Sequence, residues 1–140
     1  MKAYFTRTYK ISASHRLHSE ELSAVQNRAT FGKCNNPHGH GHNYRIEITV
    51  GGPVDPATGM VINMVTLDRL VNAVVVARFD HMNLNFDSLF AEKVSTTENL
   101  CIGIFQLLAA EFKAKALKPA ILEKVRIEET ENNFFEYSGD

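Results

Sequence analysis

Three histidines at alternate positions mark the part of this sequence where chemistry is most expected. His38, His40 and His42 stand in the run 34–44, Cys-Asn-Asn-Pro-His-Gly-His-Gly-His-Asn-Tyr, which continues into the alternating segment 44–50. That alternation is typical of a half-buried strand. Extended backward, it places His40 and His42 on one face, about 6–7 Å apart along the chain. Two imidazoles so placed can share one metal ion.

His15 offers a third imidazole from a different segment. Residues 3–15 alternate between apolar and polar types, which predicts a strand, and His15 continues the side that carries Ile11. By itself such a histidine is more often a hydrogen-bonded core residue. Beside His40 and His42 it becomes the natural third ligand, and we favour that interpretation.

The spacing leaves open which two of the three alternate histidines bind. His38 has the same parity as His40 and His42, and we prefer the latter two because they lie next to the regular strand. Gly39 and Gly41 leave room beside them and let the backbone bend toward a ligand.

Three histidines without a nearby fourth protein ligand are typical of a catalytic zinc site. Such an ion keeps a position open for water or a substrate oxygen and acts as a Lewis acid. Cys34 could reach the same cavity, where a dication would favour a thiolate that moves protons. Asp80 and His81 offer a second acid–base pair, although their polar stretch also fits a solvated connection.

A carboxylate on an apolar face is a further candidate. In the predicted strand 124–130, Glu129 has the parity of Val125 and Ile127. A charge there is costly unless it is paired or used, or unless the strand end has already left the core. We favour a functional role, because an inward carboxylate can hold the N–H groups of a heterocycle.

Composition and charge exclude several classes of protein. The 140 residues are 44% hydrophobic and 22% charged with a formal net charge of −1, as expected of one globular domain, residues 1–140. Neither nucleic acid nor a membrane is an expected partner, because there is no basic excess and no long apolar run. The start of the chain lacks the apolar core of a signal peptide, so we expect a cytoplasmic protein with Cys34 as a free thiol.

The remaining elements in the first half follow from turn residues. The polar residues 19–31 end at Gly32 and predict a short helix or ordered loop. The Gly-, Pro- and Asp-rich segment 51–59 predicts a turn. We expect residues 60–63 to return as a brief strand and close a hairpin.

Two helices are predicted by apolar residues at helical spacing. The first begins near Leu67, is capped by Asn63 or Thr66, and ends near Phe79. The second follows the run 95–98 and extends to about residue 116.

Residues 95–98, Ser-Thr-Thr-Glu, have two readings of equal weight. They fit a capping box that joins Ser95 to Glu98. They also fit a binding role, since a helix start presents free N–H groups to a ligand.

The last elements complete an α+β fold. Asn132-Asn133 between two short β-rich segments predicts a final hairpin. Antiparallel strands around two consecutive helices predict a four-stranded antiparallel sheet with both helices on one face. The open face and the sheet edges would then favour oligomerisation.

Several motifs together resemble one known family, the 6-pyruvoyltetrahydropterin synthases. The resemblance covers nearly the whole chain in order, and its most specific motif is Cys34-Asn-Asn-Pro-x-Gly-His-Gly-His-Asn-Tyr44. The other matching motifs are Ser12-Ala-Ser-His15-Arg-Leu-His18, Asp55-Pro-x-Thr-Gly-Met60, Asp80-His81-x-Asn-Leu84, Ser95-Thr-Thr-Glu-Asn99 and Glu129-Thr-x-Asn-Asn133. His38 departs from the pattern, because animal members are expected to have Asn there.

The resemblance implies a fold, an assembly and a reaction. The family has the tunnelling fold, in which sheets join into a barrel within a trimer and two trimers form a hexamer. Its members convert 7,8-dihydroneopterin triphosphate to 6-pyruvoyltetrahydropterin and triphosphate, with internal redox of the side chain. Magnesium is expected to act with the triphosphate.

The resemblance also implies roles for individual residues. One zinc ion per chain would lie on His15, His40 and His42, and Cys34 would be the general base. Asp80 and His81 would complete a proton relay that crosses a subunit boundary. The pterin would be held by acids at Glu98 and Glu129 in a pocket lined by Thr96 and Thr97. Which acid is the main anchor, and which works with His81, stays open.

Two other functions are kept as alternatives. The sibling 6-carboxytetrahydropterin synthase of the deazapurine pathway usually has its cysteine nearer the His-Gly-His pair, so the longer spacing after Cys34 favours the pyruvoyl enzyme. A non-catalytic zinc module would leave Cys34 and His81 without a role. The inward Glu129 and the missing fourth ligand argue against that module.

Overall fold

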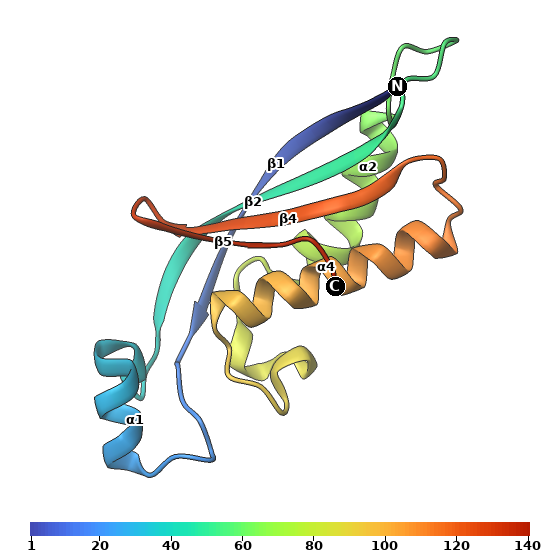
Figure 1. Ribbon diagram of the computed structural model, residues 1–140. Helices are drawn as coiled ribbons and strands as arrows, with labels where there is room; N and C mark the ends of the chain where they lie inside the picture. The colour runs from blue at the N-terminus through green and yellow to red at the C-terminus, as the bar shows by residue number, and fades with distance from the viewer.

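The computed structural model describes all residues, 1–140, and consists of a long twisted sheet with helices packed on one face (Figure 1). The strands are β1 (Lys2–His15), β2 (His40–Pro53), β3 (Met82–Asn83), β4 (Ile121–Thr130) and β5 (Asn133–Tyr137). The α-helices are α1 (Ala24–Phe31), α2 (Met64–Val71), α3 (Ala77–Phe79) and α4 (Thr97–Ala114).

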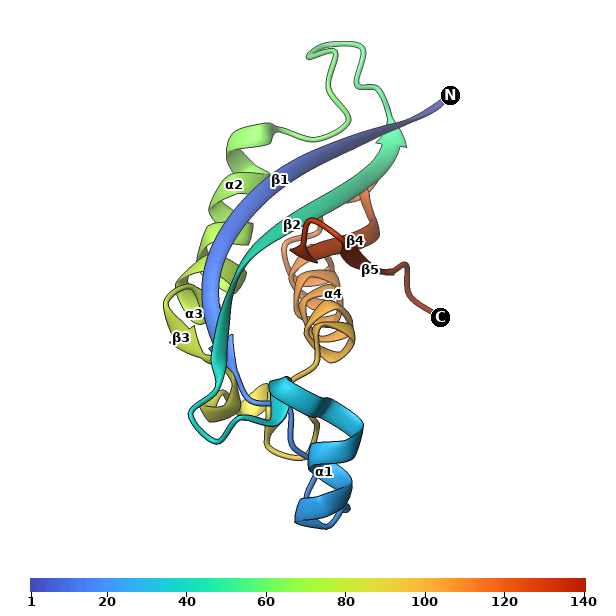
Figure 2. The same cartoon turned by 90° about the vertical axis from the view of Figure 1, so that its left-hand side faces the viewer.

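The two longest strands form the ladder on which the rest is built. β1 and β2 pair antiparallel without interruption, from Lys2 opposite Pro53 to His15 opposite His40. The alternation read from the sequence is present on both strands, because Ile11 and its partner Tyr44 are both buried. The sheet also curves strongly along its length (Figure 2).

The sheet differs from the prediction in strand number and type. It has five strands in the order β3-β1-β2-β4-β5, and β3 runs parallel to β1. The predicted four-stranded antiparallel sheet is therefore wrong in this respect, although the α+β class is correct. A strand of only two residues carries no periodic signal that a sequence could reveal.

The predicted returning strand at residues 60–63 does not form. Both edges of β2 are occupied, by β1 on one side and β4 on the other, so no edge is available for it. The segment instead closes on itself as a loop, with hydrogen bonds from Asp55 N to Met60 O (3.0 Å) and from Gly59 N to Asp55 O (2.7 Å).

The first long helix is continuous from α2 to α3 but contains a π-helical segment, Asn72–Val76. Its fully buried residues are spaced four apart: Leu67, Val71, Val75 and Phe79. In a regular α-helix each such step drifts by about 40°. The wider π turn takes up that drift, so the stripe stays on the sheet. Asn63 caps the helix, as one of the two predicted caps.

The second long helix, α4, packs Leu100, Ile104 and Leu108 against the sheet. Its cap is Thr96, whose side chain accepts the Asn99 N–H, and not the predicted box of Ser95 and Glu98. Three successive hydroxyl residues offered alternative caps, and Ser95 is used elsewhere in the site. The helix ends at Ala114, two residues before the expected position.

Helix α1 projects beyond the end of the sheet (Figures 1 and 2). It lies within the predicted range and ends at Gly32 as expected. Its only buried residue is Asn27, whose side chain bonds the backbone of Ser19, Leu22 and Ser23. Helix α1 is therefore held by polar contacts and not by the packing of an apolar face.

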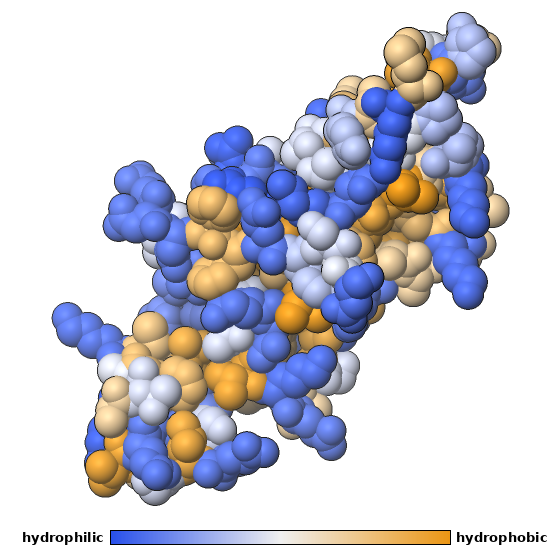
Figure 3. Space-filling model, viewed as in Figure 1, coloured by the Kyte–Doolittle hydropathy of each residue, from blue (hydrophilic) through white to orange (hydrophobic).

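The surface is mixed in character. Apolar residues lie scattered among hydrophilic ones in the view of Figure 3. No helix combines the length and the apolar character that crossing a bilayer would need.

Candidate functional site

The predicted histidines meet at one end of the sheet. His15 is the last residue of β1 and His40 the first of β2, and the two are direct partners in the ladder. His42 follows two residues later on the same face. Each ring offers one nitrogen, and these atoms all lie within 4.8 Å of one another. The Nε2 atoms of His15 and His40 are 3.1 Å apart.

His15 is held in a defined tautomer. Its ring is buried, and its Nδ1 lies 2.6 Å from the carbonyl oxygen of Ser95, just before α4. A carbonyl only accepts, so Nδ1 carries the proton and Nε2 keeps its lone pair for a ligand. The loop before α4 thus orients the strand-borne ring. The sequence names Ser95 only as a cap or as part of a binding segment, because a backbone carbonyl that orients a histidine leaves no signal in a sequence.

The electrostatics of the histidine cluster fit a metal ion. His40 Nδ1 and His42 Nε2 are buried without a hydrogen-bond partner, which is costly unless a ligand satisfies them. Burial lowers the pKa of His15 and of His42, so both rings stay neutral, the form that binds metals. Three imidazoles match the donor set of zinc with an open position.

His38 is not part of this cluster. It is exposed, and its backbone N–H donates to the Asn36 side chain (3.1 Å) in the loop before β2. The geometry therefore selects His40 and His42, as expected from their place beside the strand. Their role as ligands stays a prediction.

Of the two glycines predicted to leave room, only Gly39 is sterically required. It has a φ of +74°, and a Cβ on it would lie 3.0 Å from the His15 carbonyl oxygen. A Cβ on Gly41 would make only an ordinary contact, at 3.5 Å from the Ala13 carbonyl oxygen. Gly39 is thus what allows the two strand ends to approach each other.

An acidic residue lies on the same face. Glu129 stands at an irregularity between Glu128 and Thr130 of β4, and its side chain accepts a hydrogen bond from Thr97 Oγ1. Tyr44, beside His42 in the ring cluster, has a hydroxyl that is buried without a hydrogen-bond partner, and burial raises its pKa. The site therefore contains an inward carboxylate and an unused hydroxyl close to the histidines.

The other two residues of the predicted substrate pocket are placed differently. Thr96 uses its hydroxyl to cap α4. Glu98 is exposed in the first turn of that helix. Of the two predicted acids, Glu129 is therefore the one that points inward.

Asp80 and His81 form a pair at the edge of the sheet. Asp80 Oδ2 lies 3.0 Å from His81 Nδ1, and Oδ1 accepts the Ser12 N–H at 2.8 Å. This bond from Ser12 is the main reason why the pKa of Asp80 is lowered. His81 has a φ of 62°, and its side chain is 82% exposed.

The structure of one chain does not bring this pair to the histidine cluster. His81 lines a hollow together with Ser12, Ser14, Asn43 and also His42 of the cluster. In the alternation of β1, Ser12 and Ser14 point away from the face that carries His15.

Cys34 lies in a 3₁₀ turn, Gly32–Asn35, between α1 and β2, and is half-buried. Its carbonyl accepts the Leu17 N–H at 2.8 Å, which docks the turn on the segment directly after His15. The second cysteine, Cys101, is buried against β4 and β5, where burial raises its pKa to about 12. Cys34 is thus the thiol that a reagent or substrate can reach.

Comparisons with known proteins agree with this geometry. A family model described as 6-pyruvoyl tetrahydropterin synthase matches residues 4–140. The 6-pyruvoyl tetrahydrobiopterin synthase of Poecilia reticulata is 46% identical over 138 residues, 98% of this chain and 90% of the relative. The Drosophila melanogaster protein of that name is 48% identical, over 98% and 80% of the two chains.

A solved structure shows the same fold. That of Caenorhabditis elegans 6-pyruvoyl tetrahydropterin synthase superposes with a TM-score of 0.92 and 42% identity, covering 100% of this chain and 97% of that one. A more distant relative from Archaeoglobus fulgidus, named putative 6-carboxy-5,6,7,8-tetrahydropterin synthase, is 35% identical over 84% of this chain and 90% of its own.

Proposed function

The chain belongs to the 6-pyruvoyl tetrahydropterin synthase family, and on that premise we propose that it converts 7,8-dihydroneopterin triphosphate to 6-pyruvoyltetrahydropterin. Inorganic triphosphate leaves, and the product serves tetrahydrobiopterin synthesis. The observation that carries the proposal is the meeting of three histidines, two of which have a buried ring nitrogen without a protein partner. It lies beside an inward carboxylate, as a site for a metal and a heterocycle requires.

His15, His40 and His42 would hold one zinc ion per chain. When bound, zinc polarises the hydroxyl and carbonyl oxygens of the substrate side chain and makes neighbouring protons more acidic. The Ser95 carbonyl fixes the tautomer of His15, so the protein presents that ligand without reorganisation.

Glu129 is the group we assign to the pterin ring. A carboxylate accepts two N–H groups side by side, as the amino-pyrimidine edge of a pterin offers them. Thr97 donates to one oxygen of Glu129 and so fixes the plane of the carboxylate. We assign Glu98 a secondary place at the rim of the pocket with Thr96, because it is exposed.

Proton transfer is assigned to two groups. Cys34, as the thiolate, takes a proton from the substrate side chain. The Asp80–His81 pair gives a proton to the substrate side chain. Asp80 accepts both the Ser12 N–H and a hydrogen bond from the His81 ring, which lowers the pKa of Asp80 and orients the imidazole. Magnesium accompanies the triphosphate.

The position of His81 favours a site shared between chains. Its side chain is largely exposed at the β3 edge of the sheet, so His81 would serve the cluster of a neighbour. Trimers joined through their sheets, paired into a hexamer, would supply that neighbour. The long unpaired edge of β1 is available for such a contact, since β3 covers only Ala13 and Ser14.

Product analysis tests the proposal. The zinc-loaded protein is incubated with dihydroneopterin triphosphate and magnesium, and the products are identified together with the zinc content per chain. We expect the pyruvoyl product, stoichiometric triphosphate and one zinc per chain. A carboxy product with acetaldehyde would instead assign the chain to the activity named for the archaeal relative.

The Cys34→Ala variant tests the catalytic role of the thiol. We expect zinc and assembly to be retained while triphosphate release falls about 100-fold or more, the scale of a lost acid–base group. Unchanged turnover in Cys34→Ala and in His81→Ala would remove both residues from the mechanism, and a parent protein that binds zinc but gives no product would be a non-catalytic zinc module.

A further inference from the structure

We propose that Asn35 and Arg16 are positioning residues that hold the Cys34 turn against the end of β1. They would act on the reaction through the thiol, so the inference rests on the proposed function of Cys34. It names a buried amide and a guanidinium, neither of which contacts the histidine cluster.

The side-chain NH2 group of Asn35 has a partner for each hydrogen. Its Nδ2 donates to the Leu17 carbonyl (2.7 Å) and lies 3.2 Å from His18 Nδ1, so each of its two hydrogens has an acceptor. Leu17 also donates its N–H to the Cys34 carbonyl. Both backbone groups of Leu17 are therefore held by the Cys34 turn.

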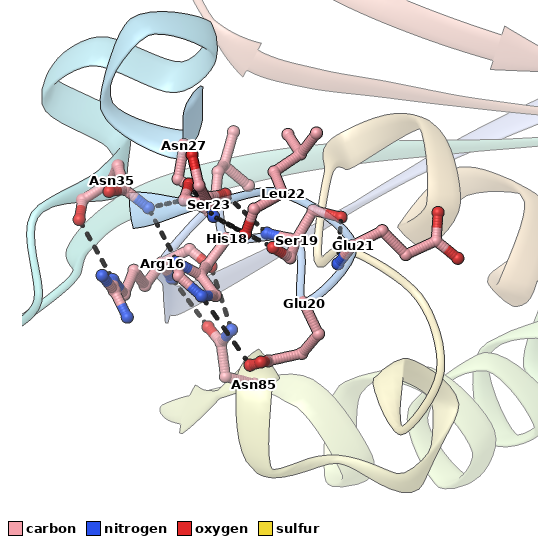
Figure 4. A network of polar contacts seen from close by, with 11 residues as sticks. Arg16, His18, Ser19, Glu20, Glu21, Leu22, Ser23, Asn27, Asn35 and Asn85 are labelled. Carbon is pink, nitrogen blue, oxygen red and sulfur yellow. Dashed lines mark hydrogen bonds and ion pairs between the residues drawn. The ribbon is translucent and has the colours of Figure 1, made fainter. Parts of the chain in front are cut away.

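Arg16 joins the same turn to a third segment. Its Nε donates to the Asn35 carbonyl at 3.0 Å. Its own backbone is held by Asn85, which accepts the Arg16 N–H (2.7 Å) and donates to the Arg16 carbonyl (2.9 Å). The Ser95 hydroxyl also donates to that carbonyl, at 3.3 Å. Figure 4 shows Asn35 and Asn85 reaching the segment around Arg16 from two different loops.

These contacts connect the thiol to the metal site. Ser95 orients the His15 ring through its carbonyl and holds Arg16 through its hydroxyl. Arg16 then donates to the Asn35 carbonyl, which extends this chain of hydrogen bonds to the turn that contains Cys34. The distance between the thiol and the histidine cluster is thus set by hydrogen bonds and not by the short 3₁₀ turn, which has little stability of its own.

The two asparagines of this turn differ in a way that points to Asn35. Asn35 is 5% exposed, whereas Asn36 is exposed and its side chain accepts only the His38 N–H of its own loop. A buried amide with both hydrogens donated outside its own turn is a specific restraint. A displacement of about 1 Å at a reacting group can cost about 100-fold in rate.

The test compares Asn35→Asp with Asn36→Asp. Each adds one negative charge to the same turn. Asn35→Asp turns a donor into a carboxylate facing the Leu17 carbonyl, while Asn36→Asp keeps the acceptor for His38. We expect kcat to fall by about 10-fold to 100-fold in Asn35→Asp, with KM and zinc content nearly unchanged. Asn36→Asp should match the parent.

A second readout reports on the thiol itself. The zinc-loaded proteins are alkylated with iodoacetamide, and modification of Cys34 is followed by mass spectrometry over a range of pH; the buried Cys101 serves as the internal reference. We expect a several-fold change of the Cys34 rate in Asn35→Asp and none in Asn36→Asp. A merely structural role would lower the melting temperature without moving this profile.

The double variant separates this inference from the proposed function. If Asn35 acts through the thiol, adding Asn35→Asp to Cys34→Ala costs no further activity. An inactive Cys34→Ala with kcat and alkylation both unchanged in Asn35→Asp overturns the inference alone. A fully active Cys34→Ala overturns the role of the thiol, while altered alkylation would still support the positioning. Should Asn35→Asp not fold, Arg16→Lys, which loses the Nε donor and keeps the charge, is judged by the same two readouts.

Discussion

At the scale of single residues, the site depends on which ring nitrogens are free. His15 has one nitrogen committed to the Ser95 carbonyl and the other turned toward His40. His40 and His42 each have a buried nitrogen with no partner in the protein. Buried polar nitrogens without a partner are unfavourable for the protein alone, and three ring nitrogens within 4.8 Å of one another can share one ligand.

Removing one ring of the cluster should release the metal. We expect His42→Ala to lose zinc by at least 100-fold in affinity, because two imidazoles remain for an ion that prefers four ligands. His38→Ala should keep one zinc per chain, since His38 lies in the loop outside the cluster. Zinc content after gel filtration, by atomic absorption, decides this. If His42→Ala kept its zinc and His38→Ala lost it, His38 and not His42 would be the third ligand.

The burial of His15 makes the stability of the metal-free protein depend on pH. Its pKa is lowered in the folded state, so below about pH 6.5 the unfolded chain binds a proton that the folded chain does not. Stability must therefore fall as the pH falls through 6.5 toward the folded pKa, by up to about 1.4 kcal/mol per pH unit for one such group.

Urea unfolding of the chelator-treated protein at several pH values measures this. His15→Asn, which can keep a donor for the Ser95 carbonyl, should lose less stability between pH 7 and pH 5 than the parent. His42, whose pKa is also lowered, leaves a residual slope in that variant. Parallel curves for variant and parent would contradict the assignment to His15.

At the scale of elements, the site is formed where β1 ends and β2 begins, and Gly39 is the residue that lets them meet. A Cβ there would lie 3.0 Å from the His15 carbonyl oxygen, so the backbone of His15, which is paired with His40, would have to shift by a few tenths of an ångström. The approach of the two strand ends therefore requires glycine at this position.

Gly39→Ala should cost stability twice, through the positive φ and through the clash. Gly59 is the matched control, because it has a φ of +73° and nothing within 4 Å of its Cβ position. We expect both variants to pay about 1 kcal/mol for the backbone and Gly39→Ala to lose about 1–3 kcal/mol more. Chemical unfolding measures both. Equal losses would mean that the strand ends can separate without penalty.

The elements also show how far the sequence could be read. The period of two placed His15, His40 and Glu129 on one face, because side-chain direction in a strand follows from parity alone. Parity could not reveal β3, which is two residues long, or the Ser95 carbonyl. The strand expected at 60–63 failed because the pairing of β2 with β4 occupies the edge it needed. Long-range competition of that kind is invisible in a local pattern.

The two long helices also have features that a local sequence pattern cannot predict. The apolar stripe of the first was read correctly, but spacing alone could not show that a π turn keeps it aligned. The cap of α4 fell on Thr96 because Ser95 faces the end of β1 and holds both His15 and Arg16. Tertiary contacts therefore decided whether Ser95 or Thr96 caps α4, because both residues offer a hydroxyl group.

At the scale of the whole molecule, the single chain has the Asp80–His81 pair and the histidine cluster in different parts of the sheet. Asp80 and His81 stand at the β3 edge, and the histidine cluster faces the helices. The edge of β1 is free over most of its length, so a neighbour's strand can pair there.

A shared site predicts complementation between two inactive variants. Cys34→Ala and His81→Ala, co-expressed in equal amounts, should form mixed hexamers with about a quarter of the parent activity, since a site is intact when each chain supplies the residue the other lacks. Light scattering should give the mass of six chains in each preparation. Activity no higher than that of separately purified variants would place both groups in one chain.

The pairing of His15 in β1 with His40 in β2 has a consequence for evolution. Residues 16–38 leave the sheet after His15 and return before His40, so their length and contents can change without altering the spacing of the histidines as long as Gly39 is kept. Exchanging this excursion between relatives would alter the thiol and its supports while preserving the metal ligands. Chimeras made at these two residues are therefore a direct way to vary the reaction on an unchanged scaffold.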